Sequence, residues 1–481
     1  MLNGIRNQVR RVADYYRDPE YFRQLFKIGI PVALQQAIFS LLNMVGYVMV
    51  GQRGDVAMAA VGVAGQVYFL LNLFLFGIVS GSAMVTAQLW GKGDILNIRK
   101  VLALCLWMSI AISGIFVILA ETIPAQIVGF YSSDPQVIAL GSDCLRILAG
   151  AFIFFAITFS YGLILRSVGN VKLPVSISVA SVVLNILLSY GLIFGKLGLP
   201  EMGVLGAAWA AFISRVLECV TLLAVTYATR SPVAASPREL MSFDSRFFAR
   251  VMKPVLPVIL NELLWSLGIT AYNAVYGHIG TEALAAINIA LTVDNLAMAL
   301  FMGAGNATSV AVGNLIGAGE KEKAYRYAGR SLGLGIGLAV LVGVIVLLTR
   351  DPVIALYKVS SEAADAAYRI LTILGLFLWI RMTNMIVIIG ILRSGGDTHY
   401  SLFLDGVIIW ILGVPMAVLG GFLLHLPVYW VYLMTMSEEL TKCILGLRRY
   451  FSRKWIHDLT QAVQTAPSIA ESVTKSVLDI S

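Results

Sequence analysis

The sequence predicts an all-α, polytopic membrane protein with twelve transmembrane helices, and three observations carry this prediction. Of the 481 residues, 58% are hydrophobic and only 13% are charged, whereas a soluble globular chain carries about 25% charged residues. The mean hydropathy is +0.83. Apolar runs of about 20 residues or more, long enough to cross a bilayer, recur along the whole chain. This composition excludes a water-soluble enzyme.

The twelve apolar runs are bounded by charged residues or by Gly and Pro, which favour turns and loops at the helix ends. Twelve crossings need about 240 residues, so the chain has ample length for its loops. The helices are expected at 28-50, 63-89, 101-121, 138-165, 173-195, 203-229, 254-276, 285-315, 327-349, 364-392, 400-423 and 426-447.

The charges in the loops predict the orientation of the chain. Basic residues gather in alternate loops, and basic loops stay in the cytoplasm. We therefore expect a multi-pass protein of the plasma membrane, the inner membrane of a bacterium, with both termini in the cytoplasm. The cytoplasmic group is Lys92, Arg99, Lys100, Arg166, Lys172, the stretches 230-253 and 321-330, Arg393 and the stretch 448-454, whereas the opposite group is Arg53, Lys196, Arg350 and Lys358.

The two halves of the chain repeat one another at an almost constant offset of 226 residues. Pro31-Val32 matches Pro257-Val258, and Gly91-x-Gly93 matches Gly317-x-Gly319. Because each half has an even number of helices, both copies enter the membrane from the same side. The sequence therefore predicts two parallel six-helix repeats related by a pseudo-twofold axis along the membrane normal.

The repeat also predicts the domain organisation. Two parallel bundles leave a cleft between them, and rocking one bundle against the other exposes that cleft to each side of the membrane in turn. This is the architecture of a transporter. The expected parts are a basic amphipathic N-terminal segment at 1-26, an N-terminal six-helix bundle at 27-229, a cytoplasmic linker at 230-250, a C-terminal six-helix bundle at 251-447 and a cytoplasmic C-terminal tail at 448-481.

Three duplicated landmarks resemble the multidrug and toxic compound extrusion (MATE) family over nearly the whole chain. They are an early Pro in the first helix of each half, the small-residue stretch that begins at Gly51 with its partner at Gly277, and a Leu-Arg-x-x-Gly-(Asn/Asp) motif at 165-170 and 392-397. The resemblance implies a secondary active efflux transporter, which exports organic and often cationic compounds by alternating access in exchange for H+ or Na+.

The resemblance also implies a coupling Glu in the seventh helix, and Glu262 stands at that position. In the first helix the chain departs from the family. Many bacterial and archaeal members carry an Asp where this chain has Gly46 after Asn43. This departure argues against proton coupling in the first half.

Acids within apolar helices are candidates for cation coupling by physical reasoning alone. An ionised group at the centre of such a helix costs about 2.5 to 3.5 kcal/mol, so it usually faces a cavity or a partner. Glu262, Asp294 and Asp405 meet this description. The alternative is structural, because an ion pair between Arg381, the basic residue expected deep in the second-half core, and Asp294 would compensate both charges.

The same alternative applies to the last helix, in which Glu438 and Glu439 precede Lys442 by four and three residues. This spacing favours a local ion pair over a transport site.

Amides and aromatic residues in the core helices are candidates for substrate contact. Gln36 occupies the repeat position of Glu262, so the first half has a neutral amide where the second half has an acid. Each type of residue has a structural alternative. Buried amides also bridge helices through hydrogen bonds, and aromatic residues commonly serve only for packing. The expected substrate-binding residues are Gln36, Asn43, Asn185, Asn261, Trp265, Tyr272, Asn273, Arg381 and Asn384.

Other classes of function lack their sequence signals. We find neither a Walker A pattern for ATP coupling nor a His, Cys and acid pattern for a metal site or a hydrolase. We therefore expect no enzyme activity, no metal and no cofactor other than the coupling ion. The expected partners are small organic substrates and membrane lipid, without nucleic acid, and the chain is expected to act as a monomer. The alternative is a flippase for lipid-linked oligosaccharides from the same wider superfamily, whose cavity should be rich in Arg and Lys.

Overall fold

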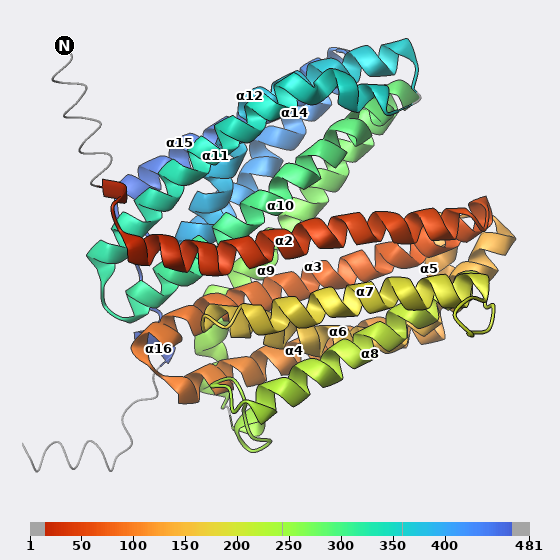
Figure 1. Cartoon of the computed structure of the whole chain (residues 1–481). Coiled ribbons are helices and arrows are strands. Elements are labelled where there is room, and N and C mark those ends of the chain that lie inside the picture. The colour runs from red at the N-terminus through yellow and green to blue at the C-terminus, as the bar shows by residue number, and fades with distance from the viewer. Residues whose placement is uncertain (1–14, 243, 358, 464–481) are drawn as a thin grey trace, which may run out of the picture.

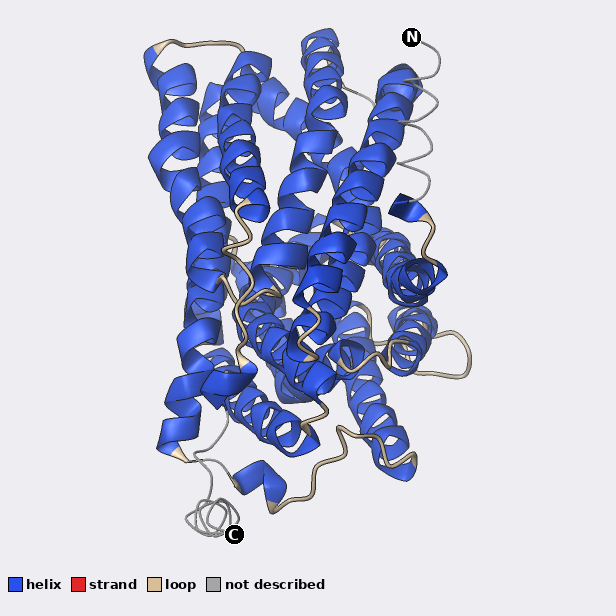
Figure 2. Ribbon diagram, turned by 90° about the vertical axis from the view of Figure 1, so that its left-hand side faces the viewer, coloured by secondary structure: helices blue, strands red, loops and turns tan. Residues whose placement is uncertain are grey.

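The computed structural model describes residues 15-242, 244-357 and 359-463, and within these ranges it contains helices and loops but no strand (Figures 1 and 2). The first half consists of α2 (Pro19–Gly51), α3 (Asp55–Lys92), α4 (Ile95–Thr122), the short α5 (Pro124–Tyr131), α6 (Pro135–Ser167), α7 (Lys172–Phe194) and α8 (Val204–Ala228). The linker contains η1 (Glu239–Met241).

The second half repeats this arrangement with two helices that contain π-helical segments. It consists of α9 (Ser245–Ile279), α10 (Thr281–Gly317), α11 (Lys321–Ala355), α12 (Ser361–Met385) continued by η2 (Ile386–Arg393), the run α13 (Thr398–Ser401), η3 (Leu402–Val407), η4 (Ile409–Gly413), α14 (Val414–Val418) and η5 (Leu419–Leu423), then α15 (Val428–Phe451) and the short α16 (Thr460–Val463).

These elements confirm the all-α polytopic class. Eleven helices among the described residues are long and apolar enough to cross a membrane. The twelfth predicted helix corresponds to α15, which has 24 residues but carries two Glu and a Lys near its middle. Of the amphipathic segment expected at 1-26, residues 1-14 lie outside the described residues. Residues 19-26 form the first turns of α2.

Short polar residues fix the helix ends. The side chain of Asp94 accepts a hydrogen bond from the Asn97 backbone N–H (3.1 Å) and that of Asp134 accepts one from Gln136 (2.8 Å), which satisfies backbone donors that the first helical turn leaves unpaired. At the end of α3, Gly93 adopts a φ of 78°, a left-handed conformation that a glycine reaches without strain.

The helices form two bundles that lie close together near α16 and diverge toward the other end of the molecule (Figure 1). The first helix of each half packs against the second helix of the other, α2 on α10 and α9 on α3. Glycines permit both contacts. A Cβ atom at Gly77 would lie 2.9 Å from the Cα of Ile259, and one at Gly303, its repeat counterpart, would lie 2.5 Å from the carbonyl oxygen of Gly29. The pseudo-twofold axis therefore runs through the interface between the halves.

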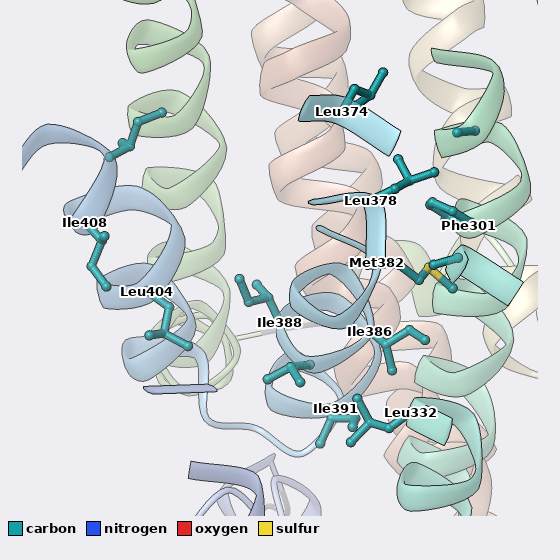
Figure 3. Packing of buried hydrophobic residues seen from close by; sticks show 14 of the residues in the cluster. Phe301, Leu332, Leu374, Leu378, Met382, Ile386, Ile388, Ile391, Leu404 and Ile408 are labelled. Carbon is teal, nitrogen blue, oxygen red and sulfur yellow. The ribbon is translucent and has the colours of Figure 1, made fainter. Parts of the chain in front are cut away.

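Each bundle has its own apolar core. In the second half, Phe301, Leu378, Met382 and Ile386 pack between α10, α12 and η2, and Leu404 approaches from η3 (Figure 3). All five are buried. This core holds the helices that carry the charged residues described below.

The linker packs against the first half. Val233 and Ala235 are fully buried, and Arg99 forms an ion pair with Glu239 at 2.7 Å. The carboxylate of Glu239 accepts hydrogen bonds from the Ser236 backbone N–H and from the Arg99 guanidinium. Both donors stabilise the charged form and so lower the pKa of Glu239.

Candidate functional site

A cavity within the second half collects five of the predicted site residues. It lies between α9, α10, α12 and α15 and contains about 690 Å³, counting the space at its opening. The predicted residues on its wall are Trp265, Tyr272, Asn273, Asp294 and Arg381, and two acids of α15, Glu438 and Glu439, join them. We call this the second-half cavity.

An arginine lies among the acids of the second-half cavity. Arg381 forms an ion pair with Asp294, as the structural alternative expected. The Nε of Arg381 lies 3.7 Å from Oε1 of Glu439. Asn384 donates hydrogen bonds to Oε2 (2.6 Å) and to the backbone carbonyl (2.8 Å) of the same glutamate. Two carboxylates thus share one guanidinium.

A chain of alternating charges connects this cavity to Glu262. Arg393 Nη1 lies 2.7 Å from Glu262 Oε1, and Arg393 Nη2 lies 3.8 Å from Asp405 Oδ2. Lys442 Nζ contacts Asp405 Oδ1 at 2.9 Å and also pairs with Glu438. Glu262, Arg393, Glu438 and Lys442 are buried. Charged groups far apart in the sequence therefore form a continuous path through the second half.

Two predicted residues fix the position of this path. Asn261, which is fully buried, donates a hydrogen bond from Nδ2 to Asp405 Oδ2 at 3.0 Å. Tyr272 donates one from its hydroxyl to Glu438. Arg393 ends the π-helical segment η2 and Asp405 lies in η3, and π-helical turns occur frequently at functional sites.

The network holds more acid than base. If every member is ionised, five carboxylates face three cationic groups, which leaves two negative charges. In a low-dielectric interior such an excess must be neutralised by protons or by bound cations. The acids are Glu262, Asp294, Asp405, Glu438 and Glu439, and the bases are Arg381, Arg393 and Lys442.

A second cavity lies between the halves, on the pseudo-twofold axis, and we call it the inter-half cavity. It contains about 650 Å³, counting the space at its opening. Repeat counterparts from the two halves face one another on its wall. They are Phe76 and Met302, Ser80 and Asn306, Ala83 and Ser309, Met84 and Val310, and Leu163 and Ile389, each 226 residues apart, with Arg166 and Arg393.

Next to this cavity, α3 and α10 cross where the basic loops gather, and we call this contact the α3–α10 crossing. A Cβ at Gly91 would lie 1.8 Å from the carbonyl oxygen of Asn314, and a Cβ at Gly317 would lie 1.8 Å from that of Gln88. The two contacts are repeat counterparts. Only glycine at both positions allows the helices to approach this closely.

The C-terminal segment covers the α3–α10 crossing. Gln88 Nε2 donates to the carbonyl oxygens of Ser394 (2.8 Å) and His457 (3.1 Å), and its Oε1 accepts from the Leu459 backbone N–H (2.7 Å). The His457 N–H donates to the Gly395 carbonyl oxygen at 2.7 Å. One amide of the first half thereby joins the second half and the tail.

The comparisons with known proteins agree with this duplicated architecture. The sequence model of the MatE family matches residues 31-191 and again residues 257-419, together more than half of the chain. The chain belongs to the MatE family. Its two matches begin at the proline that opens each half of the repeat.

Curated relatives of this MatE chain include two bacterial proteins that carry the name "Probable multidrug resistance protein NorM". The one from Thermotoga maritima is 23% identical over 437 residues, which cover 91% of this chain and 94% of the relative. The one from Rhizobium meliloti is 28% identical, with 82% and 85% covered. Similar solved structures include an "outward-facing conformation of a multidrug resistance MATE family transporter" (TM-score 0.81, 19% identity, 92% and 97% covered) and a "MATE in the bent conformation" (TM-score 0.82, 19% identity, 92% and 97% covered). They establish the fold.

Five predicted substrate-binding residues of the MatE chain line neither cavity. Two of them, Asn261 and Asn384, contact the carboxylates of Asp405 and Glu439 in the charged network. Gln36 and Asn185 are half-buried on α2 and α7, and Asn43 is exposed on α2.

Sequence reasoning missed several members of the two sites. Glu438 does form the expected local pair with Lys442, but it and Glu439 also line the second-half cavity. Arg381 was expected to be the basic residue deep in the second half, whereas Arg393 and Lys442 are more deeply buried there. The duplicated Leu-Arg motif was the available signal for Arg393.

Proposed function

We propose that this MatE protein exports organic, often cationic compounds in exchange for H+ or Na+, and that the charged network of the second half holds the coupling ion. The observation that carries the proposal is the excess of carboxylates over cationic groups in a membrane-embedded bundle. Binding of protons or Na+ lowers the free-energy cost of two uncompensated negative charges within a group of membrane helices.

The geometry suggests how ion binding in the second half affects the inter-half cavity, in which we propose that the substrate binds. Glu262 lies at one end of the network and contacts Arg393, which is also on the wall of the inter-half cavity. When Glu262 is protonated, Arg393 loses its closest counter-charge and its guanidinium can turn toward Asp405 or toward the cavity. Protonation of Glu262 therefore makes the inter-half cavity more positive, which disfavours a cationic substrate there. The ion and a cationic substrate thus compete.

The available driving force is sufficient. A tenfold gradient of the ion supplies about 1.4 kcal/mol, and each charge that moves through 100 mV supplies about 2.3 kcal/mol. The ion gradient alone supports a substrate gradient of about tenfold, and the two terms together supply about 3.7 kcal/mol, which supports about five-hundredfold.

We also propose that the protein lies in a bacterial cell membrane with both termini in the cytoplasm, and that it acts as a monomer. Support for the orientation comes from the end of α3 at Lys92, the first turn of α11 at Lys323 and the turn at Arg453, which gather at one end with the start of α2. Lys323 pairs with Glu20 of α2 at 3.1 Å, and basic loops remain in the cytoplasm. Bacterial relatives support the location.

Ethidium transport into inverted vesicles tests the function, because the cytoplasmic face of the membrane points outward in them and export therefore moves the dye into the vesicle. With an imposed pH or Na+ gradient, the wild-type protein should move ethidium uphill, and collapse of one of the two gradients should stop it. Glu262→Gln imitates permanent protonation and should remain folded and inserted without uphill transport. Glu282→Gln removes an exposed acid of α10 and should transport as the wild type does. Undiminished uphill transport by Glu262→Gln and by Asp294→Asn would show that neither acid couples the ion.

A further inference from the structure

The inter-half cavity contains an arginine without an acidic partner. Arg166 lies at the end of α6, and its Nη2 donates a hydrogen bond to Gln35 Oε1 at 2.7 Å. Its Nε is buried and has no hydrogen-bond acceptor. Among the described residues, no carboxylate lies within ion-pair distance of this guanidinium. Arg166 is half-buried, and a guanidinium with a buried Nε that only an amide contacts lacks the counter-charge that such a group normally has.

The second half of the same chain shows what compensates an arginine at this position. Arg393 is the repeat counterpart of Arg166, and it lies 2.7 Å from Glu262 and 3.8 Å from Asp405. In the first half, Gln36 stands at the repeat position of Glu262. The first half has therefore kept the arginine and lacks the carboxylate.

A second donor on the same wall is also unpaired. The hydroxyl oxygen of Ser80 is buried and has no hydrogen-bond partner, and Ser80 lines the cavity together with Arg166. Most of the remaining wall is apolar, with side chains such as Phe76 and Met84 from the first half and Met302 and Ile389 from the second. Its other polar residues are Ser167, Asn306, Ser309 and Arg393. Two donors without an acceptor, set in an apolar wall, are suited to a negatively charged group on an apolar body.

We propose that Arg166 and Ser80 form a binding site for the anionic group of an organic compound, whose apolar body lies against the walls of the inter-half cavity. This inference rests on the proposed function and specifies it, because it extends the substrates beyond cations to amphiphilic acids. A soluble organic carboxylate and the headgroup of an anionic lipid share this chemistry. Ser80 and Arg166 supply the donors, and the ligand supplies the counter-charge that the first half lacks.

Two dansyl compounds with the same apolar body test the site. Dansylglycine carries a carboxylate and dansylglycinamide is neutral, so their ratio of affinities isolates the contribution of the charge. Binding is measured at equilibrium by fluorescence polarisation, on the full chain in phosphatidylcholine nanodiscs, with empty nanodiscs subtracted. The wild-type protein should bind the acid about tenfold or more tightly than the amide, the factor typical of a hydrogen bond to a charged group.

Three variants separate binding from structure. Arg166→Gln should bring the affinity ratio close to one, and Arg166→Lys, which keeps the charge, should retain a clear preference for the acid. Gln35→Leu removes the protein partner of Arg166 and should preserve the preference. If Arg166 only ties α6 to α2, Gln35→Leu will behave as Arg166→Gln does, which would overturn the proposal. The proposal also fails if the wild-type protein binds both compounds equally, or if Arg166→Gln leaves the ratio unchanged.

The lipid source is tested by adding phosphatidylglycerol to the nanodiscs. Displacement of dansylglycine supports the site and assigns it to a lipid headgroup, whereas continued binding supports the site and assigns it to soluble acids. The measurement uses no ion gradient. A protein that prefers the acid but cannot expel ethidium contradicts the proposed function alone, and a protein that expels ethidium without the preference contradicts this inference alone.

Discussion

The α3–α10 crossing yields a prediction whose expected magnitude follows from one distance. In Gly317→Val the new Cβ would lie 1.8 Å from the carbonyl oxygen of Gln88, whereas a carbon and an oxygen in close contact lie about 3.3 Å apart. The helices must therefore separate by about 1.5 Å. Overpacking of this kind costs about 1 to 3 kcal/mol, which shifts the equilibrium between closed and open forms by a factor of about 5 to 150. The variant should favour a state that is open to the cytoplasm.

Labelling of a cysteine in the inter-half cavity measures this shift. Ala83 lines that cavity next to the crossing, so Ala83→Cys should react slowly with a membrane-impermeant maleimide added on the cytoplasmic side of inverted vesicles. In the Gly317→Val background its rate should rise about tenfold. The four native cysteines are buried, and a protein without the Ala83 substitution gives their contribution.

A valine elsewhere provides the matched control. A Cβ at Gly337 in α11 meets no heavy atom within 4 Å, so Gly337→Val should leave the labelling rate unchanged. Equal rates for Gly317→Val and the unsubstituted background, in protein that remains folded, would refute the conclusion that this crossing closes the cavity.

Two further predictions concern stability. Lys442→Met leaves Asp405 and Glu438 without their closest cationic group, and breaking a buried ion pair typically costs about 3 to 5 kcal/mol, so the thermal midpoint of unfolding at pH 7 should fall. The control Arg369→Met breaks an exposed ion pair and should change the midpoint little. Equal midpoints for Lys442→Met and the wild-type protein would contradict the network. The folded-state pKa of Glu239 is lowered, so its pair with Arg99 contributes stability above the unfolded pKa of about 4.3 and loses it as the pH falls through the lower folded-state pKa. The difference in thermal midpoint between the wild-type protein and Glu239→Gln should therefore be present at pH 7 and shrink as the pH falls below about 4.3. A midpoint difference that does not change with pH would show that the Glu239 carboxylate is not its source.

The fold could be predicted from the sequence because its signals are local and repeated. A helix expected at 400-423 is observed as the run from Thr398 to Leu423, since a continuous apolar stretch and its flanking turns determine the span of a membrane helix. The duplication gave the parallel arrangement, because counterparts such as Gly91 and Gly317 are visible as a repeated spacing.

The candidate site was only partly predictable, because it depends on contacts between distant helices. The spacing of Glu438 and Lys442 signals a local pair, and that pair is present. Nothing in the spacing shows that Glu438 also accepts a hydrogen bond from Tyr272, 166 residues away. Arg166 was counted among basic loop residues, since its position at the end of α6 is what the positive-inside rule expects. The lack of a carboxylate partner for Arg166 can be seen only when the side chains of α2 and α6 are placed together.

Direct measurement of ion release tests the central claim, that the excess carboxylates of the second half hold the coupling ion. Ethidium is added to purified protein in weakly buffered detergent solution, while a pH indicator reports protons and bound 22Na+ is counted. Because ion and cationic substrate compete, ethidium binding should release protons or 22Na+, and Glu262→Gln should release fewer ions per bound ethidium. Saturable ethidium binding by the wild-type protein that releases neither ion would contradict the account.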